Sequence, residues 1–438
     1  MKRLIYNDLL RWKSRADRKP LILLGARQVG KTYILKEFGN NEFKQVVYLN
    51  CHQNKFADTL FRDFSVERIV TDLERYYEAK IVPGESLVVF DEIQEVKDGL
   101  AVLKYFCEDM PSLHVAVAGS LLGISLKADE SYPVGKVNTL RMYPMTFTEF
   151  LLACGRDRLV ELLNTLNWEE INAFSDIFIN YLRQYYFVGG MPEAVKSFTE
   201  SNDTLLVREI QHEILDAYML DISKHTKHKA GKIRQLWNSI PAQLARENKK
   251  FIFSAVKKGS RAADYEEAIQ WLVDAGLVYK VERTTAPIMP LKFYCDYSAF
   301  KLYFLDCGLL ACQSEASPKD LLLGTNAFES FKGAFTENYV LQQYIAVAGV
   351  NPYYFSKDNS SMEIDFLYQH EGSIVPIEVK AEVNVKSKSL NNFVNVDFAD
   401  KHLKALRISM KPYIDQGWME NIPLYAAEVV FRKEEGKK

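Results

Sequence analysis

Hydrophobic and polar positions in the first 150 residues follow a repeating pattern of short apolar runs and amphipathic stretches. The apolar runs cover residues 21–24, 46–50, 87–90 and 115–118, and helical periodicity lies between them, as in 32–38 and 66–77. Strands that alternate with helices are typical of a parallel sheet. The pattern therefore predicts an α/β fold for this part of the chain.

Beyond residue 147 the periodicity changes, and the change divides the remaining chain into three parts. Residues from Phe147 to about Thr226 are almost wholly helical, which predicts a helical lid. Then come a helix over 233–246, an apolar run over 251–256, a helix over 262–275 and the alternating segment LVYKVER, the order expected of a winged helix. Alternating strands at 363–367 and 373–381 follow a helical stretch that begins near Phe328. We expect the parts to cover 1–150, 151–228, 229–298 and 299–438.

The first apolar run leads into GARQVGKT, which has the spacing of a phosphate-binding P-loop. In such a loop backbone N–H groups wrap a polyphosphate, Lys31 reaches the β and γ phosphates, and Thr32 holds Mg²⁺. The alternative is a glycine-bearing turn before an ordinary helix. The preceding strand favours a nucleotide site, with the binding residues Gly25, Ala26, Arg27, Gln28, Val29, Gly30, Lys31 and Thr32.

Two later strand ends supply groups that a P-loop needs for catalysis. The run LVVF ends in Asp91 and Glu92, so Asp91 is expected in the Mg²⁺ shell and Glu92 beside the water that attacks the γ-phosphate. On its own this could be a strand that simply leaves the core. A third run ends in Gly119 and Ser120, and we expect Ser120 to lie beside the γ-phosphate as a sensor.

Composition and length agree with a multidomain protein that carries no membrane span. The chain has 438 residues and 48% hydrophobic positions, enough for two to four packed domains. Its longest apolar candidate, residues 113–126, is too short and is interrupted by polar residues. The charged N-terminal segment has no signal-peptide core, which makes the cytoplasm the expected location. The six cysteines are scattered and none lies in a Cys-x-x-Cys pair, so they indicate neither disulfides nor a zinc site. The pair His225 and His228 does not indicate a zinc site either.

Positive charge is concentrated in residues 224–261, which contain eleven lysines and arginines and the single acid Glu247. Contact with nucleic-acid phosphate is the functional interpretation. Against this interpretation, the charged residues of the helix that would enter a groove are all acidic and lie at positions 264, 266, 267 and 274. The alternative is a packing module with a solvated basic surface.

Three acids and a lysine form a second constellation in the C-terminal part. Glu378 and Lys380 lie two apart, hence on one face of a strand, and Asp365 lies on the neighbouring strand. Asp365 and Glu378 are candidate ligands of a divalent metal, Lys380 would orient a water or stabilise a phosphate, and Glu337 from a helix would complete the shell. An amphipathic hairpin with one solvated charged face is the competing interpretation.

The motifs together resemble a family of bacterial and archaeal AAA-like P-loop ATPases. In that family the P-loop domain is followed by a winged helix and a C-terminal domain of unknown function related to the PD-(D/E)xK nuclease fold. The matching segments are GARQVGKT, LVVFDE, AGSLLG, YPMTFTEFL, YFVGGMPEAV, KLYFLDCGLL, GAFTENYV, EIDFLY and IEVKA.

The resemblance implies a parallel P-loop sheet with a helical lid over 1–228, a winged helix over 229–298 and a nuclease-like α/β domain over 299–438. It implies ATP and Mg²⁺ at Lys31, Thr32, Asp91 and Glu92. It also implies a nuclease-like metal cluster at Glu337, Asp365, Glu378 and Lys380. Related chains often carry Gly-Arg where this one has Gly135 and Lys136, so a γ-phosphate finger would have to come from Arg141.

Two functions are consistent with these features. In the first, an ATPase controls the access of a C-terminal nuclease-like domain to DNA, with or without metal-dependent cleavage. In the second, the chain is a nucleotide-gated switch or protein-interaction module with no nuclease activity. ATP is the expected ligand of both, and DNA, a second copy of the chain and an unidentified protein are candidate partners.

Overall fold

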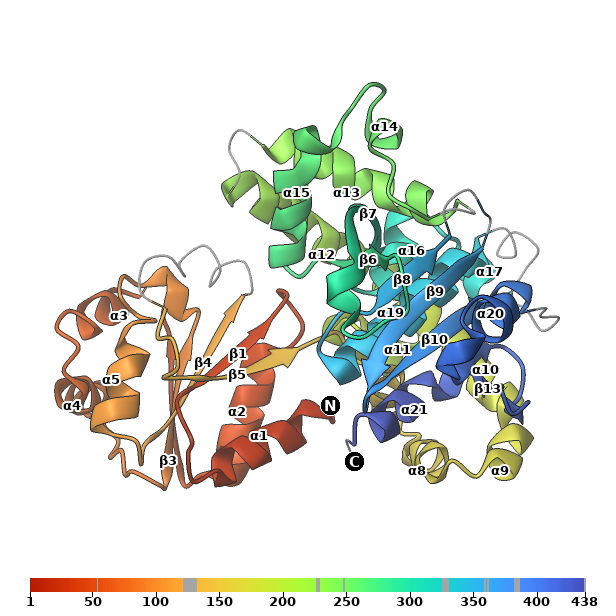
Figure 1. Ribbon diagram of the computed structural model, residues 1–438. Coiled ribbons are helices and arrows are strands. Elements are labelled where there is room, and N and C mark those ends of the chain that lie inside the picture. Colours follow the sequence, from red (N-terminus) through yellow and green to blue (C-terminus); the bar gives the residue numbers. More distant parts are fainter. Residues whose placement is uncertain are drawn as a thin grey trace. The chain divides into compact units, whose positions relative to one another are not determined.

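The computed structural model describes residues 1–52, 54–120, 132–225, 229–246, 249–324, 331–357, 360, 362–381 and 387–436 (Figure 1). The chain forms two compact units. Met1–Tyr143 with Asp274–Gly276 make the first unit, and Pro144–Val273 with Leu277–Lys438 make the second.

The first unit is built on a five-stranded sheet in the order β2-β3-β4-β1-β5. All neighbouring strands run parallel. This confirms the parallel sheet that the alternating pattern predicted. The strands are β1 (Leu21–Gly25), β2 (Gln45–Asn50), β3 (Ser86–Asp91), β4 (His114–Ser120) and β5 (Asn138–Met142).

Helices cover both faces of this sheet. One face carries α1 (Ile5–Ser14) and α2 (Lys31–Glu42), and the other α3 (Lys55–Leu60), α4 (Val66–Tyr77) and α5 (Val102–Asp109) (Figure 1). In α4 the side chain of Ser65 caps the helix, and Val66, Ile69, Val70 and Leu73 are buried on a single stripe. That stripe joins the hydrophobic core formed with the strands.

The second unit contains a mixed eight-stranded sheet in the order β12-β13-β11-β10-β9-β8-β6-β7. Strands β6 and β7 are an antiparallel pair, and β6 continues the sheet by pairing in parallel with β8. The strands are β6 (Val278–Thr284), β7 (Cys295–Phe304), β8 (Tyr353–Ser356), β9 (Glu363–His370), β10 (Ser373–Lys380), β11 (Ala405–Ser409), β12 (Ile414–Asp415) and β13 (Met419–Pro423). The segment predicted as the wing therefore belongs to the C-terminal sheet.

The remaining helices also belong to the second unit. They are α7 (Phe147–Ala153), α8 (Asp157–Thr165), α9 (Trp168–Ala173), α10 (Ser175–Val188), α11 (Pro192–Ser201), α12 (Thr204–His225), α13 (Ala230–Leu244), α14 (Phe253–Val256), α15 (Ala262–Asp274), α16 (Cys307–Gln313), α17 (Pro318–Leu323), α19 (Lys332–Ala348), α20 (Lys388–Asn392) and α21 (Ala427–Glu434). The expected helix, apolar run, second helix and alternating segment correspond to α13, α14, α15 and β6, and the apolar run contains the short helix α14.

The helices expected to form a lid pack against the C-terminal elements instead. Phe178 of α10 stacks on Tyr425 with ring centroids 4.9 Å apart. Thr148 of α7 donates its backbone N–H and its hydroxyl to the buried carboxylate of Glu428. These contacts join segments that are far apart in the sequence. The helical periodicity that predicted a lid does not indicate which sheet the helices cover.

A buried carboxylate ties three segments of this unit together. Asp306 accepts hydrogen bonds from the backbone N–H of Gly190 and Leu309 and from the side chain of Gln342. A Cβ atom at Gly189 would lie 2.1 Å from the Oδ1 atom of Asp306, so no side chain fits there. The segments YFVGGMPEAV and KLYFLDCGLL thus meet in a structural crossing.

The expected boundary after residue 150 falls inside α7, and the expected boundary at 298/299 falls inside β7. Within the described residues, no helix is long and apolar enough to cross a bilayer.

Candidate functional site

The P-loop predicted from GARQVGKT is a tight connection between the end of β1 and the start of α2. A Cβ atom on Gly25 would lie 2.4 Å from the carbonyl oxygen of Met142, so only glycine fits there. Gln28 and Gly30 have φ angles of 65° and 96°, which lie in the left-handed region where glycine is least strained. The loop geometry therefore depends on Gly25 and Gly30, whereas Gln28 adopts the left-handed conformation without being a glycine.

Lys31 is buried at the start of α2 and its ammonium group bonds to the loop itself. Its Nζ atom donates to the carbonyl oxygens of Gly25, at 3.1 Å, and Ala26, at 2.8 Å. Burial lowers the pKa of Lys31 to about 8, although the nearby carboxylates of Glu92 and Asp91 act in the opposite direction. Neutral carbonyls compensate a buried ammonium only in part, so this group fits an anionic ligand.

Asp91 at the end of β3 is oriented by two hydroxyl groups. Its Oδ2 atom accepts from the Thr32 hydroxyl at 2.7 Å and from the Tyr48 hydroxyl at 2.6 Å. The predicted pair of Thr32 and Asp91 is thus brought together, as a hydrated Mg²⁺ ion would require. Tyr48 was not anticipated, because it lies in the middle of β2 and no local motif marks it.

The remaining catalytic candidates meet at the same edge of the sheet. Gly25 pairs with Ser120, and Asp91 pairs with Ala118, so the ends of β1, β3 and β4 lie together. Glu92 follows with a φ angle of 52°.

The carboxylate of Glu92 accepts a hydrogen bond from the side-chain amide of Gln94. Gln94 is buried, and its own carbonyl oxygen has no hydrogen-bond partner within the described chain. The sequence interpretation did not include Gln94.

Arg141 and Lys136 differ in their surroundings. Lys136 forms an ion pair with Glu108 at 2.8 Å. Arg141 is exposed on β5, directly opposite Leu24 of β1. Burial raises the pKa of the neighbouring Tyr143, and the charge of Arg141 opposes that shift. Arg141 is the more accessible of the two cations, because it is exposed whereas Lys136 is half-buried.

The C-terminal constellation is a buried cluster of acids and lysines. Glu337 on α19 binds the ammonium group of Lys249 through one oxygen and the Tyr303 hydroxyl, at 3.1 Å, through the other. Lys301 of β7 is fully buried and forms an ion pair with Glu363. Burial would raise the pKa of Glu337, but Lys249 and Lys301 lower it. The sequence interpretation missed Lys249, Lys301 and Tyr303, which lie far from the predicted strands in sequence, and it gave no role to Glu363, which lies in a predicted strand.

The other three predicted residues lie in the same cluster. Asp365 accepts the backbone N–H of Val379 at 2.7 Å, and burial, with Glu337 nearby, raises its pKa to about 7. Lys380 is 3.1 Å from one oxygen of Glu378. The second oxygen of Glu378 is buried and has no hydrogen-bond partner in the described chain.

The arrangement of these acids does not match the predicted metal shell. Among the residues that the structure describes, no three or more His, Cys, Asp or Glu side chains are placed to hold a metal ion. Lys249 and Lys301 stand beside the carboxylates instead. As arranged, the cluster does not fit the second divalent metal expected from the sequence.

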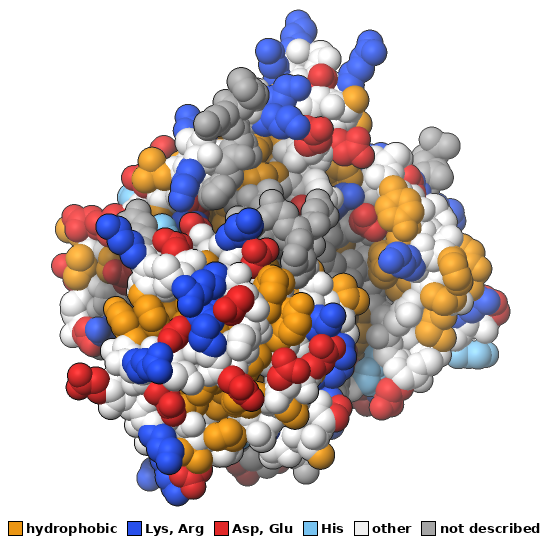
Figure 2. Space-filling view, turned by 90° about the vertical axis from the view of Figure 1, so that its left-hand side faces the viewer, with side chains coloured by type: hydrophobic (Ala, Val, Ile, Leu, Met, Phe, Trp, Pro, Cys, Tyr) orange, Lys and Arg blue, Asp and Glu red, His pale blue; other side chains and the backbone are white. Residues whose placement is uncertain are grey.

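The basic stretch at 224–261 has exposed cations next to an acidic helix, α15. Lys257, Lys258 and Arg261 are exposed between α14 and α15, and Figure 2 shows blue side chains gathered at the height of α14. The exposed side of α15 carries acids, of which Glu267 forms an ion pair with Lys229. Lys227 and Glu247 of this stretch lie outside the described residues.

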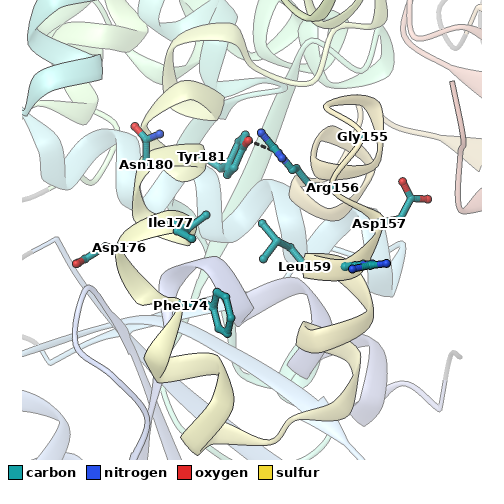
Figure 3. Close-up of a pocket in the computed structure, with 10 residues that line it drawn as sticks. Gly155, Arg156, Asp157, Leu159, Phe174, Asp176, Ile177, Asn180 and Tyr181 are labelled. Carbon is teal, nitrogen blue, oxygen red and sulfur yellow. Dashed lines mark hydrogen bonds between the residues drawn. The ribbon is translucent and has the colours of Figure 1, made fainter.

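A cavity of about 730 Å³ lies in the second unit, apart from all predicted site residues. It is lined by the turn before α8 and by the start of α10. Figure 3 shows Leu159, Ile177 and Phe174 around the hollow and Arg156 hydrogen-bonded to Tyr181. No buried charged group points to a particular ligand there.

Three family models match the chain in succession. Residues 17–151 match an AAA domain, residues 179–320 match a domain of unknown function, DUF8612, and residues 332–425 match a second one, DUF4143. None of these descriptions names a nuclease or a winged helix. Together with the parallel sheet, the first match shows an AAA-like P-loop ATPase domain in the N-terminal unit.

Solved structures with a similar course of the chain are distant. The Walker-type ATPase of Pyrococcus abyssi is 14% identical with a TM-score of 0.44, over 70% of this chain and 94% of that one. The ORC1 protein of Aeropyrum pernix in complex with DNA is 14% identical with a TM-score of 0.24, over 71% and 90%. A RuvB variant of Thermotoga maritima is 14% identical with a TM-score of 0.28, over 63% and 88%. No curated protein matches the chain significantly.

Proposed function

We propose that the chain binds ATP with Mg²⁺ and hydrolyses it at the P-loop of its N-terminal unit. The observation that carries the proposal is Lys31, a buried ammonium group whose hydrogen bonds within the described residues go to the neutral loop carbonyls of Gly25 and Ala26. Phosphate oxygens would give it the negative charge that those carbonyls lack. Backbone N–H groups of the tight loop built around Gly25 and Gly30 would bind the same phosphates.

Each remaining candidate has a role that follows from its position. Thr32 and Asp91 would hold the Mg²⁺ ion, which when bound neutralises charge on the phosphates. Glu92 would orient and deprotonate the attacking water, and Ser120 would contact the γ-phosphate. The exposed Arg141 suits a γ-phosphate contact in a neighbouring copy, which would make the active form a homo-oligomer.

Two substitutions and one control test this proposal. Lys31→Ala should abolish nucleotide binding, and Glu92→Gln should retain binding but slow turnover by roughly 100-fold or more, because the general base is lost. Lys44→Ala removes an exposed lysine that is ion-paired with Glu85, and it should leave both unchanged. Unaltered ATP turnover in Lys31→Ala would refute the assignment.

We also propose, as a second function, that the nucleotide state controls DNA contact by the second unit. The exposed cations at 257, 258 and 261 support this proposal, because clustered lysine and arginine attract phosphate. The double variant Lys257→Glu with Lys258→Glu should weaken DNA binding and reduce its salt dependence. The control, Lys319→Glu with Lys388→Glu, makes the same charge change at exposed sites elsewhere in this unit. Equal losses in both variants would mean that binding follows net charge alone.

The alternative is a nucleotide-gated switch or protein-interaction module without nuclease activity, and the lysines in the C-terminal cluster favour it. Nicking of DNA with Mg²⁺ or Mn²⁺ that disappears in Asp365→Ala would establish cleavage. Nicking that survives this substitution would exclude the cluster as its source. We propose the cytoplasm as the location of the protein, because ATP, the proposed ligand of both functions, is present there.

A further inference from the structure

We propose that Lys249 is a resident cation of the C-terminal carboxylate cluster and occupies the place at Glu337 where a divalent metal ion would bind. The cluster then holds an internal ammonium group in place of a metal. Metal binding would require Lys249 to leave.

The contacts of Glu337 support this assignment. The Glu337 side chain is about 7% exposed, and its two oxygens are taken by Lys249 and Tyr303. Only about 13% of the Lys249 side chain is exposed, so the ion pair is shielded from water. A carboxylate that is buried in this way needs a cation, and removing one partner leaves an uncompensated charge.

The charge balance of the cluster points in the same direction. Four carboxylates (Glu337, Glu363, Asp365 and Glu378) face three ammonium groups (Lys249, Lys301 and Lys380). Arg407 of β11 lies opposite Glu378 and adds a fourth cation near the cluster, and it donates to Asn421 and Ser387. Loss of Lys249 would therefore reduce the positive charge in the cluster and remove the ammonium group bonded to Glu337. Within the described chain, the second oxygen of Glu378 has no hydrogen-bond partner, so this carboxylate would supply a contact to a cation that replaced Lys249.

Lys249 is the exchangeable member of this set. Lys301 lies within β7 and is fully buried, whereas Lys249 lies between α13 and α14 and keeps some exposure. It also belongs to the basic stretch for which DNA contact is proposed above. Phosphate groups of DNA would compete with Glu337 for the Lys249 ammonium group and so release it. This part of the inference rests on the DNA contact proposed above.

The test is Mn²⁺ binding measured by calorimetry on the full chain without nucleotide. In Lys249→Met the Mn²⁺ dissociation constant should fall roughly tenfold or more relative to wild type, as expected for removing a unit charge from such a cluster. Lys250→Met removes the next lysine along the chain and should behave as wild type, and Lys249→Arg keeps the charge and should do the same. Adding Glu378→Gln to Lys249→Met should abolish the gain.

If Lys249→Met fails to fold, Lys249→Gln applies the same test, because its amide can still donate to Glu337 without a charge. Equal Mn²⁺ binding in wild type and in the neutral variants, or no binding in any of them, would overturn the inference. A gain in Mn²⁺ affinity without DNA binding or nicking would support the inference and count against the DNA function. The ATPase proposal is tested separately through Lys31.

Discussion

Arg3 is predicted to shape the P-loop although it lies far from it in the sequence. Its side chain is 9% exposed. One terminal nitrogen donates to the carbonyl oxygen of Val29 at 2.9 Å, and the other donates to that of Tyr143 at 2.7 Å. Because a peptide plane holds its C=O and N–H antiparallel, fixing the Val29 carbonyl also fixes the direction of the Gly30 N–H. Arg3 would thus orient a phosphate-binding group without touching the phosphate.

The magnitude follows from the two hydrogen bonds. A hydrogen bond from a charged donor contributes about 1.5–3 kcal/mol. If the full energy of the hydrogen bond to Val29 stabilises the loop conformation that binds ATP, its loss should weaken ATP binding roughly 10- to 100-fold. The bond to Tyr143 should appear instead in the free energy of unfolding, since Tyr143 lies outside the loop.

The assay compares ATP affinity and thermal unfolding in Arg3→Ala, Arg3→Lys and Arg11→Ala. Arg11 lies on α1, is exposed and is ion-paired only at the surface with Asp8, so its removal controls for a lost arginine. Arg3→Lys should recover part of the affinity, because one ammonium group can still reach one carbonyl. Normal ATP affinity in a folded but destabilised Arg3→Ala would refute the reasoning and leave Arg3 a purely structural role.

Three further predictions concern single contacts. Tyr48→Phe removes one donor to Asp91 and should raise the Mg²⁺ concentration needed for turnover several-fold; an unchanged Mg²⁺ titration would contradict this role. Burial lowers the pKa of His114 to about 4, so its stabilising contribution is complete above about pH 6.5 and is lost as the pH falls towards 4. This amounts to at most about 3 kcal/mol, and urea unfolding of His114→Phe should show a flatter pH profile than wild type. Gly189→Ala should destabilise the second unit by more than about 2 kcal/mol, because its methyl group would collide with Asp306; a wild-type melting temperature would contradict this.

The N-terminal unit was predictable because its signals are local. A P-loop, a strand ending in acids and a strand ending in serine each occupy a few consecutive residues. Parallel strands then bring their carboxyl ends to one edge, where Gly25 pairs with Ser120. Tyr48 and Gln94 were not predictable, because the partners of Asp91 and Glu92 depend on which strand is adjacent and how the backbone turns.

The second unit was less predictable because its architecture depends on long-range pairing. The alternating segment at 277–283 correctly indicated a strand. Its pairing with β8, which begins about seventy residues later, decides that it belongs to the C-terminal sheet. Lys249 and Lys301 enter the carboxylate cluster for the same reason, since neither is close in sequence to Asp365 or Glu378.

Some of the motifs that carry the family resemblance have a structural explanation. The double glycine at 189–190 and the acid at 306 meet in the buried crossing described above, and no reactive group is exposed there. The packing and hydrogen bonds at these positions explain the residues without any chemical activity. The resemblance in these segments therefore supports a shared architecture, and the functional argument rests on the P-loop and the carboxylate cluster.

The two lysines at these sites differ in what a ligand must displace. Lys31 is held by neutral carbonyls, so phosphate oxygens can replace its partners with a gain in charge compensation. Lys249 is held by a buried carboxylate, and removing it leaves Glu337 with Lys301 as the nearby ammonium group and without the cation bonded to its oxygen, unless another cation arrives at the same time. On the proposed functions, the P-loop would accept its ligand without losing a charged partner of Lys31, whereas the C-terminal cluster would have to exchange one cation for another. A metal-dependent activity of the C-terminal cluster would therefore require the release of Lys249.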